Sequence, residues 1–368
     1  MRKTYKYRVY LTNGQRRILT QQLEECRWVW NQLREARAFA YEHSLKCGRY
    51  DLINLLPTFK QQRPSLKLVH SQVLQNIAIR LDLAFQAFFR RVKEGAADAG
   101  YPRYKKRDRY HSITYPQYGN GVEIRGNDLV VSKIGRVKVV WHRPVEGQIK
   151  TVSLKRSRTN KWYVTFSVEV EPRRLPASAQ SVGVDMGLSS FLTTSNGEKV
   201  ENPRFFRRDE ADLKRVQKLK DAAKNAQRWD ENRRRKKAVA HIHERIRFRR
   251  QDFAHKRSRE LVSTYQVIAF EELELQQMGR SRGMRKSIAD AAWKQLIQYT
   301  CNKAEEAGRT AVLVDPHHTT QSCSRCGEIV RKGLNDRVHD CPYCGLVLDR
   351  DHNAAINILS RGLEQLRL

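Results

Sequence analysis

Two Cys-x-x-Cys motifs in the last part of the chain constrain its fold more than any other feature. Cys323-x-x-Cys326 and Cys341-x-x-Cys344 are separated by a short loop. Such a pair can place four thiolates tetrahedrally around one zinc ion. Because cysteine would fill every ligand position, we expect this zinc to be structural. The other three of the seven cysteines are scattered along the chain, which favours a reducing, cytoplasmic compartment over a disulfide framework.

Acidic residues accompany the zinc motif and two apolar strand patterns. Asp349 and Asp351 follow the last cysteine closely and open a helix-like run. Asp185 lies within an apolar strand pattern, and Glu271 comes directly after another, with Glu272 as the alternative register. A carboxylate inside an apolar strand is costly unless it is paired or binds a metal. These acids are therefore candidates for a functional site.

Strands alternate with helices from residue 181 onward, which predicts an α/β sheet. We expect Asp185 in the middle of the first strand, Glu271 at the carboxyl end of a neighbouring strand, and one helix over residues 287–307. In this arrangement Asp351 can converge with the other two acids. Three carboxylates suit two Mg²⁺ ions, with Mn²⁺ as an alternative, which can promote phosphodiester hydrolysis.

The net charge of +32 over 368 residues indicates a polyanionic partner. We find no apolar run of about 18 residues and no signal-peptide pattern, which argues against a membrane. Residues 204–260 hold 21 Lys or Arg against 9 Asp or Glu and keep a helical period, which predicts a basic helical hairpin. The residues expected to contact nucleic acid are Arg27, Arg34, Arg103, Tyr104, Lys105, Lys106, Arg233, Arg234, Arg235 and Lys236.

The first half of the chain combines strand and helix patterns. Residues 4–10 alternate like a strand, residues 14–95 have helical spacing, and residues 112–170 contain six short β patterns. These patterns predict a small barrel or sandwich. We expect the first strand to join it, so that the helical block is an insertion into a β domain.

Four motifs resemble those of a known family. They are Gly183–Gly187, Phe270–Leu273, Thr320–Gly327 and Asp349–Ala355. Together they look like the split RuvC nuclease of the transposon-encoded TnpB proteins, compact relatives of type V CRISPR effectors. Segments 5–10, 26–31 and 100–106 are also similar to that family, so the resemblance covers essentially the whole chain.

The resemblance implies a multidomain α+β architecture. Its parts would be a wedge β-barrel (1–13 and 105–172), a helical recognition lobe (14–104), a linker (173–180), an RNase H-like RuvC nuclease domain (181–319 and 348–368) and an inserted zinc ribbon (320–347).

The resemblance also implies an activity. Members of the family are RNA-guided DNA endonucleases of bacterial and archaeal insertion sequences. The chain would act as a monomer on a guide RNA from the transposon end and cut double-stranded target DNA beside a short motif. Asp185, Glu271 and Asp351 would be the catalytic ligands of Mg²⁺. Two alternatives remain open, a strand-transfer transposase using the same acids and a non-catalytic zinc-ribbon DNA-binding regulator.

Overall fold

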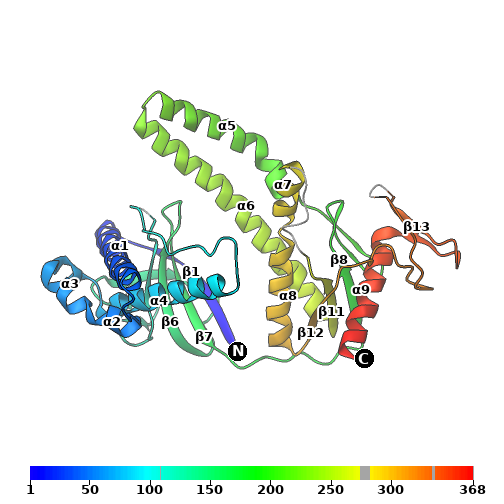
Figure 1. The fold of residues 1–368 in the computed structure, drawn as a ribbon, viewed down its shortest axis with the longest axis horizontal. Coiled ribbons are helices and arrows are strands. Elements are labelled where there is room, and N and C mark those ends of the chain that lie inside the picture. Colours follow the sequence, from blue (N-terminus) through cyan, green and yellow to red (C-terminus); the bar gives the residue numbers. More distant parts are fainter. Residues whose placement is uncertain (108, 274–281, 334–335, 368) are drawn as a thin grey trace. The chain divides into compact units, whose positions relative to one another are not determined.

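The computed structural model describes residues 1–107, 109–273, 282–333 and 336–367. The chain divides into two compact units, Met1–Val170 and Glu171–Leu368, whose elements are labelled in Figure 1. No helix in these described ranges is long and apolar enough to cross a membrane. The finer division into five segments stays a prediction.

The first unit is built on a seven-stranded antiparallel sheet in the order β2-β6-β7-β1-β5-β4-β3. Its strands are β1 (Arg2–Tyr10), β2 (Ser112–Tyr115), β3 (Val122–Arg125), β4 (Asp128–Val131), β5 (Gly135–Val140), β6 (Gln148–Arg156) and β7 (Trp162–Glu169). The first strand pairs with β7 and β5, which confirms that it joins the later β segment. A hydrogen bond from the N–H of Tyr118 to the carbonyl of Lys150 (3.1 Å) links the loop before β3 to β6, so the sheet is nearly closed.

The helical block follows β1 in the chain and precedes β2, as predicted. It consists of α1 (Asn13–Glu42), α2 (Arg49–Asn54), α3 (Leu56–Gln62), the 3₁₀ turn η1 (Pro64–Leu68) and α4 (Ser71–Lys93). Thr12 and Gln15 form a capping box, in which each side chain accepts a hydrogen bond from the other residue's N–H. The apolar faces of α1 and α4 share one core with the sheet, for example Leu23 and Phe85 with Phe166.

The second unit contains a five-stranded mixed sheet in the order β10-β9-β8-β11-β12. Its strands are β8 (Ser181–Asp185), β9 (Ser190–Thr194), β10 (Lys199–Glu201), β11 (Val267–Glu271) and β12 (Thr310–Val314). β8, β11 and β12 run parallel, whereas β9 and β10 continue the sheet antiparallel. A separate pair, β13 (Val338–Asp340) and β14 (Val347–Asp349), lies in the cysteine-rich segment.

The helices of the second unit are α5 (Phe205–Asn225), α6 (Trp229–Thr264), α7 (Arg282–Ala291), α8 (Trp293–Ala307) and α9 (Arg350–Leu366). The predicted basic helical hairpin is confirmed as α5 and α6, which pack against each other (Figure 1). The prediction of one helix over residues 287–307 is wrong. Ala292 adopts a left-handed conformation with φ of 56°, which ends α7; α7 then packs on α5 and α8 on α6.

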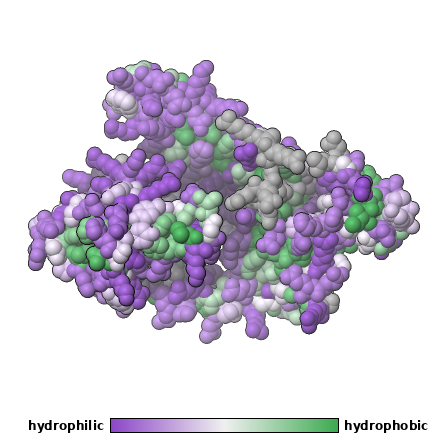
Figure 2. All heavy atoms as spheres, in the orientation of Figure 1, coloured by the Kyte–Doolittle hydropathy of each residue, from purple (hydrophilic) through white to green (hydrophobic). Residues whose placement is uncertain are grey.

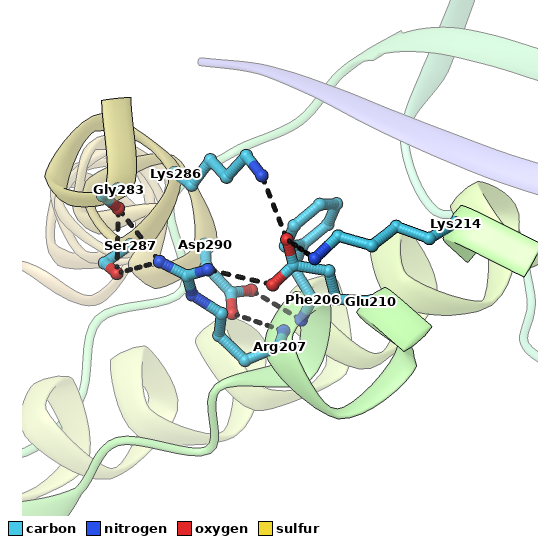
Figure 3. A network of polar contacts seen from close by, with 8 residues as sticks. All are labelled: Phe206, Arg207, Glu210, Lys214, Gly283, Lys286, Ser287 and Asp290. Carbon is cyan, nitrogen blue, oxygen red and sulfur yellow. Dashed lines mark hydrogen bonds and ion pairs between the residues drawn. The ribbon is translucent and has the colours of Figure 1, made fainter. Parts of the chain in front are cut away.

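A polar network fixes α7 against the start of α5 (Figure 3). The N-cap of α5, Arg204, supplies no side-chain cap. Instead the carboxylate of Asp290 accepts hydrogen bonds from the N–H groups of Phe206 (2.8 Å) and Arg207 (3.2 Å). Arg250 of α6 donates to the same carboxylate at 2.7 Å. Asp290 therefore satisfies N–H groups that the first turn of a helix leaves without partners.

Candidate active site and metal centre

Asp185 and Glu271 are the last residues of two neighbouring parallel strands, β8 and β11. The register pairs Val184 with Phe270, so the two acids occupy equivalent positions one step further along. Side chains at equivalent positions of parallel strands point to the same face of the sheet. The prediction for Glu271 is confirmed, whereas Asp185 lies at the carboxyl end of its strand and not in the middle, because β8 ends there.

The third acid comes from α9, which packs on β8 and β11. Asp349 is the N-cap of this helix, and its Oδ1 accepts hydrogen bonds from the N–H groups of Asp351 and His352, both at 3.1 Å. Its Oδ2 pairs with Lys199 at 2.6 Å. Asp349 is thus occupied in capping. Asp351, in the first turn, is buried and raises the pKa of Asp185 more than Asp349 does, while its Oδ1 pairs with Arg350 at 3.1 Å.

The three acids are buried, with exposed fractions of 7% for Asp185, 8% for Glu271 and 9% for Asp351. Burial raises the pKa of Asp185 well above its ordinary value, and the negative charges of Glu271 and Asp351 raise it further. Burial also raises the pKa of Glu271, although a hydrogen bond from Thr319 opposes the shift. The Arg350 guanidinium, 3.1 Å from Oδ1 of Asp351, partly offsets these negative charges and lowers the pKa of Asp185.

The neighbouring acid, Glu272, is exposed, and its backbone N–H continues the pairing with β12 by donating to Val314 (2.9 Å). Successive side chains of a strand point to opposite faces. The buried position at the end of β11 therefore belongs to Glu271, the acid preferred because it directly follows the apolar strand pattern, and its catalytic role stays a prediction.

Two glycines let α9 lie directly against the sheet. A Cβ at Gly183 of β8 would collide with the carbonyl oxygen of Ala355 and come within 2.6 Å of the backbone nitrogen of Leu359. A Cβ at Gly362 of α9 would come within 2.6 Å of the Cβ of Ala269 in β11. This close approach brings the first turn of α9, and with it Asp351, to the ends of β8 and β11.

The four cysteines of the two Cys-x-x-Cys motifs form a zinc-ribbon-like cluster. Their Sγ atoms all lie within 4.8 Å of one another. The Sγ atoms of Cys323 and Cys344 are 3.5 Å apart, and those of Cys326 and Cys341 are 3.6 Å apart. Tetrahedral coordination with Zn–S bonds of about 2.3 Å requires S–S separations of about 3.8 Å, so the donor set fits zinc.

The two motifs have the same backbone design. In each, the N–H of the glycine after the second cysteine donates to the carbonyl of the first cysteine at 2.9 Å, for Gly327 to Cys323 and for Gly345 to Cys341. Both glycines have positive φ, 81° and 70°. Burial raises the pKa of the Cys323 thiol, but hydrogen bonds from the N–H groups of Cys326 and Arg325 lower it to about 5. Two of the other thiols shift the opposite way. A hydrogen bond from the N–H of Glu328 lowers the pKa of Cys326, but desolvation and the neighbouring thiols raise it to about 12, and burial raises the pKa of Cys344. Cys323 is therefore the first of these three thiols to ionise.

Sequence reasoning missed a buried histidine beside this cluster. His339 of β13 is fully buried, and its Nδ1 accepts a hydrogen bond from the Lys332 ammonium. Among the described residues, its Nε2 has no well-aligned partner, yet the ring is near enough to Cys323 to lower the pKa of that thiol. Because Nδ1 accepts from Lys332, Nε2 is the ring nitrogen that is available to donate to this sulfur.

Sequence reasoning also missed two asparagines of α9 that hold the backbone around Cys323. Asn353, which is fully buried, accepts from the N–H of Ser324 (3.0 Å) and donates to the carbonyl of Ser322 (2.8 Å). Asn357 donates to the carbonyls of Ser322 (2.7 Å) and Thr319 (2.8 Å). The sequence feature that could have identified them is this pair of asparagines, four residues apart on the apolar face of a helix.

The basic, aromatic segment of residues 101–106 lies along α1. Arg34 donates to the carbonyl of Pro102 (2.9 Å) and stacks over the ring of Tyr104, whose centroid is 3.9 Å away. Arg27 donates to the carbonyl of Lys105 at 3.3 Å. Burial lowers the pKa of Lys105. Arg27 and Arg34 thus help to position this segment, in which the side chains of Arg103, Tyr104 and Lys106 are exposed.

The second predicted contact group lies near the start of α6, where Arg233, Arg234 and Lys236 are exposed. Arg235 is partly engaged by Glu231 at 3.4 Å. Figure 2 shows hydrophilic side chains over most of the α5–α6 hairpin. Both groups remain predicted nucleic-acid contacts.

Three family models match the chain. A "Cas12f1-like, TNB domain" model matches residues 293–358, which include all four cysteines and Asp351. A "Probable transposase" model (OrfB_IS605) matches residues 165–282, and a "Helix-turn-helix domain" model matches residues 1–46. In this structure the last range contains β1 and α1.

A curated protein from Streptomyces pristinaespiralis, named "Putative RNA-guided DNA endonuclease", is 33% identical to this chain, covering 99% of the chain and 90% of that relative. The chain belongs to the TnpB family. InsQ of Escherichia coli K12, which carries the same description, is 27% identical over 81% of the chain and 76% of that protein. Cas12f1 of Sulfoacidibacillus thermotolerans, a CRISPR-associated endodeoxyribonuclease, is 25% identical over 65% of the chain and 60% of that protein.

Solved structures of compact CRISPR effectors share the fold of this TnpB-family chain. The mini-RNA-guided endonuclease Cas-phi3 aligns with a TM-score of 0.50 at 9% identity, covering 99% of this chain and 92% of that one. CasPhi-2 bound to crRNA also aligns with a TM-score of 0.50, at 10% identity, covering 99% of this chain and 98% of that one. At such identities the likeness concerns the fold alone.

Proposed function

We propose that this chain is an RNA-guided DNA endonuclease whose nuclease site consists of Asp185, Glu271 and Asp351. The observation that carries the proposal is the convergence of these three buried acids from β8, β11 and α9. The names of the relatives support the same activity. The mixed sheet with the acids at its strand ends is the arrangement expected of an RNase H-like RuvC domain.

The three carboxylates fit a site for hard divalent cations, because Mg²⁺ prefers oxygen ligands and would offset the buried negative charge that Arg350 balances only in part. Bound Mg²⁺ would polarise the phosphodiester and activate water. The protein contributes fixed positions: the two strand ends set the spacing of Asp185 and Glu271, and the capped first turn of α9 sets Asp351.

The charge of the chain supports nucleic acids as partners. A net charge of +32 draws polyanions to a protein whose three carboxylates would otherwise repel them. We propose that the partners are a guide RNA derived from the transposon end and a double-stranded target DNA. Base pairing would select the target, while the protein would recognise the shape of the heteroduplex and a short adjacent motif. The zinc would remain structural.

The test combines RNA sequencing with cleavage. The protein is purified after expression with its native flanking DNA, and the bound RNA is sequenced after a high-salt wash. Target plasmids are then incubated with the complex and Mg²⁺. We expect Asp185→Asn, Glu271→Gln and Asp351→Asn each to abolish cleavage, whereas Glu272→Gln, the exposed neighbour, retains it.

Two outcomes would favour other activities. The "Probable transposase" model makes strand transfer the second candidate, and joined DNA products that depend on Asp185 would support it. DNA binding without any cleavage, unaffected by all three acid variants, would favour a non-catalytic zinc-ribbon regulator.

A further inference from the structure

Thr319 connects the proposed nuclease site to the zinc cluster. It is buried, with 2% of its surface exposed, and lies between β12 and Cys323. Its hydroxyl donates a hydrogen bond to Oε1 of Glu271 and is also 3.1 Å from the carbonyl oxygen of Pro316. A hydroxyl has one proton, and an ionised carboxylate is the stronger acceptor. The Thr319 hydroxyl therefore restrains one oxygen of Glu271 and leaves the other available.

The position of Thr319 is in turn fixed by α9. Asn357 bridges the carbonyls of Thr319 and Ser322, while Asn353 bridges Ser322 and Ser324 on either side of Cys323. One short backbone stretch thus holds a partner of Glu271 at one end and a zinc ligand at the other. The same helix carries Asp351 in its first turn.

We propose that Thr319 is a positioning residue for Glu271, and that the zinc-bound knuckle, through Asn353 and Asn357, keeps Thr319 in place. This inference rests on the proposed role of Glu271 as a metal ligand. A glutamate side chain has three rotatable bonds, so one fixed oxygen greatly narrows the positions of the other. A displacement of about 1 Å at a reacting centre can cost about 100-fold in rate.

The first experiment compares Thr319→Val, which keeps the shape and removes the hydroxyl, with Thr319→Ser, which keeps the hydroxyl. Thr320→Val makes the same change at the next, half-buried residue and serves as the control. We measure guided DNA cleavage as a function of Mg²⁺, Mn²⁺ binding by electron paramagnetic resonance, zinc content and melting temperature. Thr319→Val should cleave about 10- to 100-fold more slowly and bind Mn²⁺ more weakly, with zinc content unchanged. Thr319→Ser and Thr320→Val should resemble the wild type.

These measurements distinguish a failure of the proposed nuclease site from a failure of the proposed positioning role of Thr319. Full cleavage by Glu271→Gln would refute the proposed nuclease site itself. If Glu271→Gln is inactive while Thr319→Val cleaves and binds Mn²⁺ normally, only the positioning role is refuted. Loss of zinc, or a fall in melting temperature as large as that of Cys323→Ser, would show that Thr319 is merely structural.

A double-mutant cycle tests the link to α9. Asn357→Leu removes the amide that holds the Thr319 carbonyl while keeping a similar volume. If Asn357 acts through Thr319, the combination of Asn357→Leu with Thr319→Val should weaken Mn²⁺ binding no more than the stronger single change does. If the losses of Mn²⁺ affinity in the two single variants multiply in the double variant, Asn357 and Thr319 act independently, and the link is overturned.

Discussion

Gly183 of β8 packs directly against the backbone of Ala355 in α9. A side chain at Gly183 would collide with the carbonyl oxygen of Ala355 and the nitrogen of Leu359. Both are backbone atoms, so a change of side-chain rotamer cannot relieve the collision. The helix that supplies Asp351 therefore depends on this glycine for its distance from the sheet.

Gly183→Ala should accordingly destabilise the protein. Overpacking of this kind costs about 1–3 kcal/mol, and here α9 has to move away from β8. Gly14→Ala, in the first turn of α1 with its nearest neighbour 3.9 Å away, should be neutral or stabilising by about 0.5–1 kcal/mol. Denaturant unfolding of both variants measures the difference, and equal stabilities would contradict the close packing.

The zinc cluster should contribute strongly to stability. Cys323→Ser removes a buried ligand of the cluster. In small structural zinc sites, metal binding contributes about 10 kcal/mol or more to the free energy of folding. We expect lost zinc and a lower melting temperature, measured by elemental analysis and thermal unfolding with and without chelator. Cys301→Ser, outside the cluster, is the control. A melting temperature of Cys323→Ser equal to that of the wild type, or a wild type that chelator does not destabilise, would argue against a structural metal.

His339 should strengthen zinc binding without being a ligand. A donor beside a zinc thiolate stabilises its charge, and loss of such outer partners lowers metal affinity by about 10- to 100-fold. We expect His339→Phe to release zinc to a competing chelator at correspondingly lower chelator concentrations. His317→Phe changes an exposed histidine and should have no effect. Equal zinc affinities for the two variants would show that the His339 ring contributes packing only.

Asp290 should be important for the stability of α5. Asp290→Asn keeps the shape but removes the charge that pairs with Arg250 and complements the helix N-terminus. The carboxylate is buried, so we expect a loss of about 2 kcal/mol in the free energy of unfolding. Asp230→Asn removes an exposed, 3.9 Å pair with Arg233 and should change stability by less than about 0.5 kcal/mol. Similar losses in both variants would contradict the network in Figure 3.

Lys303 should make stability pH-dependent in the alkaline range. Its ammonium donates to the carbonyl of His255 and the hydroxyl of Ser258, both at 2.6 Å, and burial lowers its pKa to about 8, with Arg259 adding repulsion. Between this value and the ordinary 10.5, the unfolded chain binds the proton more tightly than the native protein does. Stability should therefore rise with pH across this window.

The measurement compares denaturation midpoints of the wild type, Lys303→Met and the exposed-site control Lys256→Met from neutral to alkaline pH. The wild type and Lys256→Met should gain stability relative to Lys303→Met as the pH increases. Parallel curves for all three proteins would show that Lys303 titrates normally.

Local patterns were sufficient to predict much of this structure. Alternation and helical spacing predicted the strands and the basic hairpin, and the Cys-x-x-Cys spacing predicted the cluster of four thiols. The apolar run ending at Glu271 correctly placed that acid at a strand end. These features depend on residues that are close in sequence, which is why they could be recognised.

The missed features depend on partners far apart in the chain. Asp290 caps a helix that begins more than 80 residues earlier, and Thr319 meets Glu271 across the sheet end. The break at Ala292 carries no glycine or proline to mark it; tertiary packing of α7 and α8 on different helices accompanies it. Nothing in the local sequence states which distant groups will be neighbours.

The packing of α9 on the sheet also sets an order of events in time. Asp185 and Glu271 are synthesised well before Asp351, and their strands can pair as soon as both have left the ribosome. The third acid arrives only when α9 has been made and has settled against Gly183 and Ala269. The proposed three-acid site is therefore incomplete in a nascent chain until α9, its last contributor, has been made.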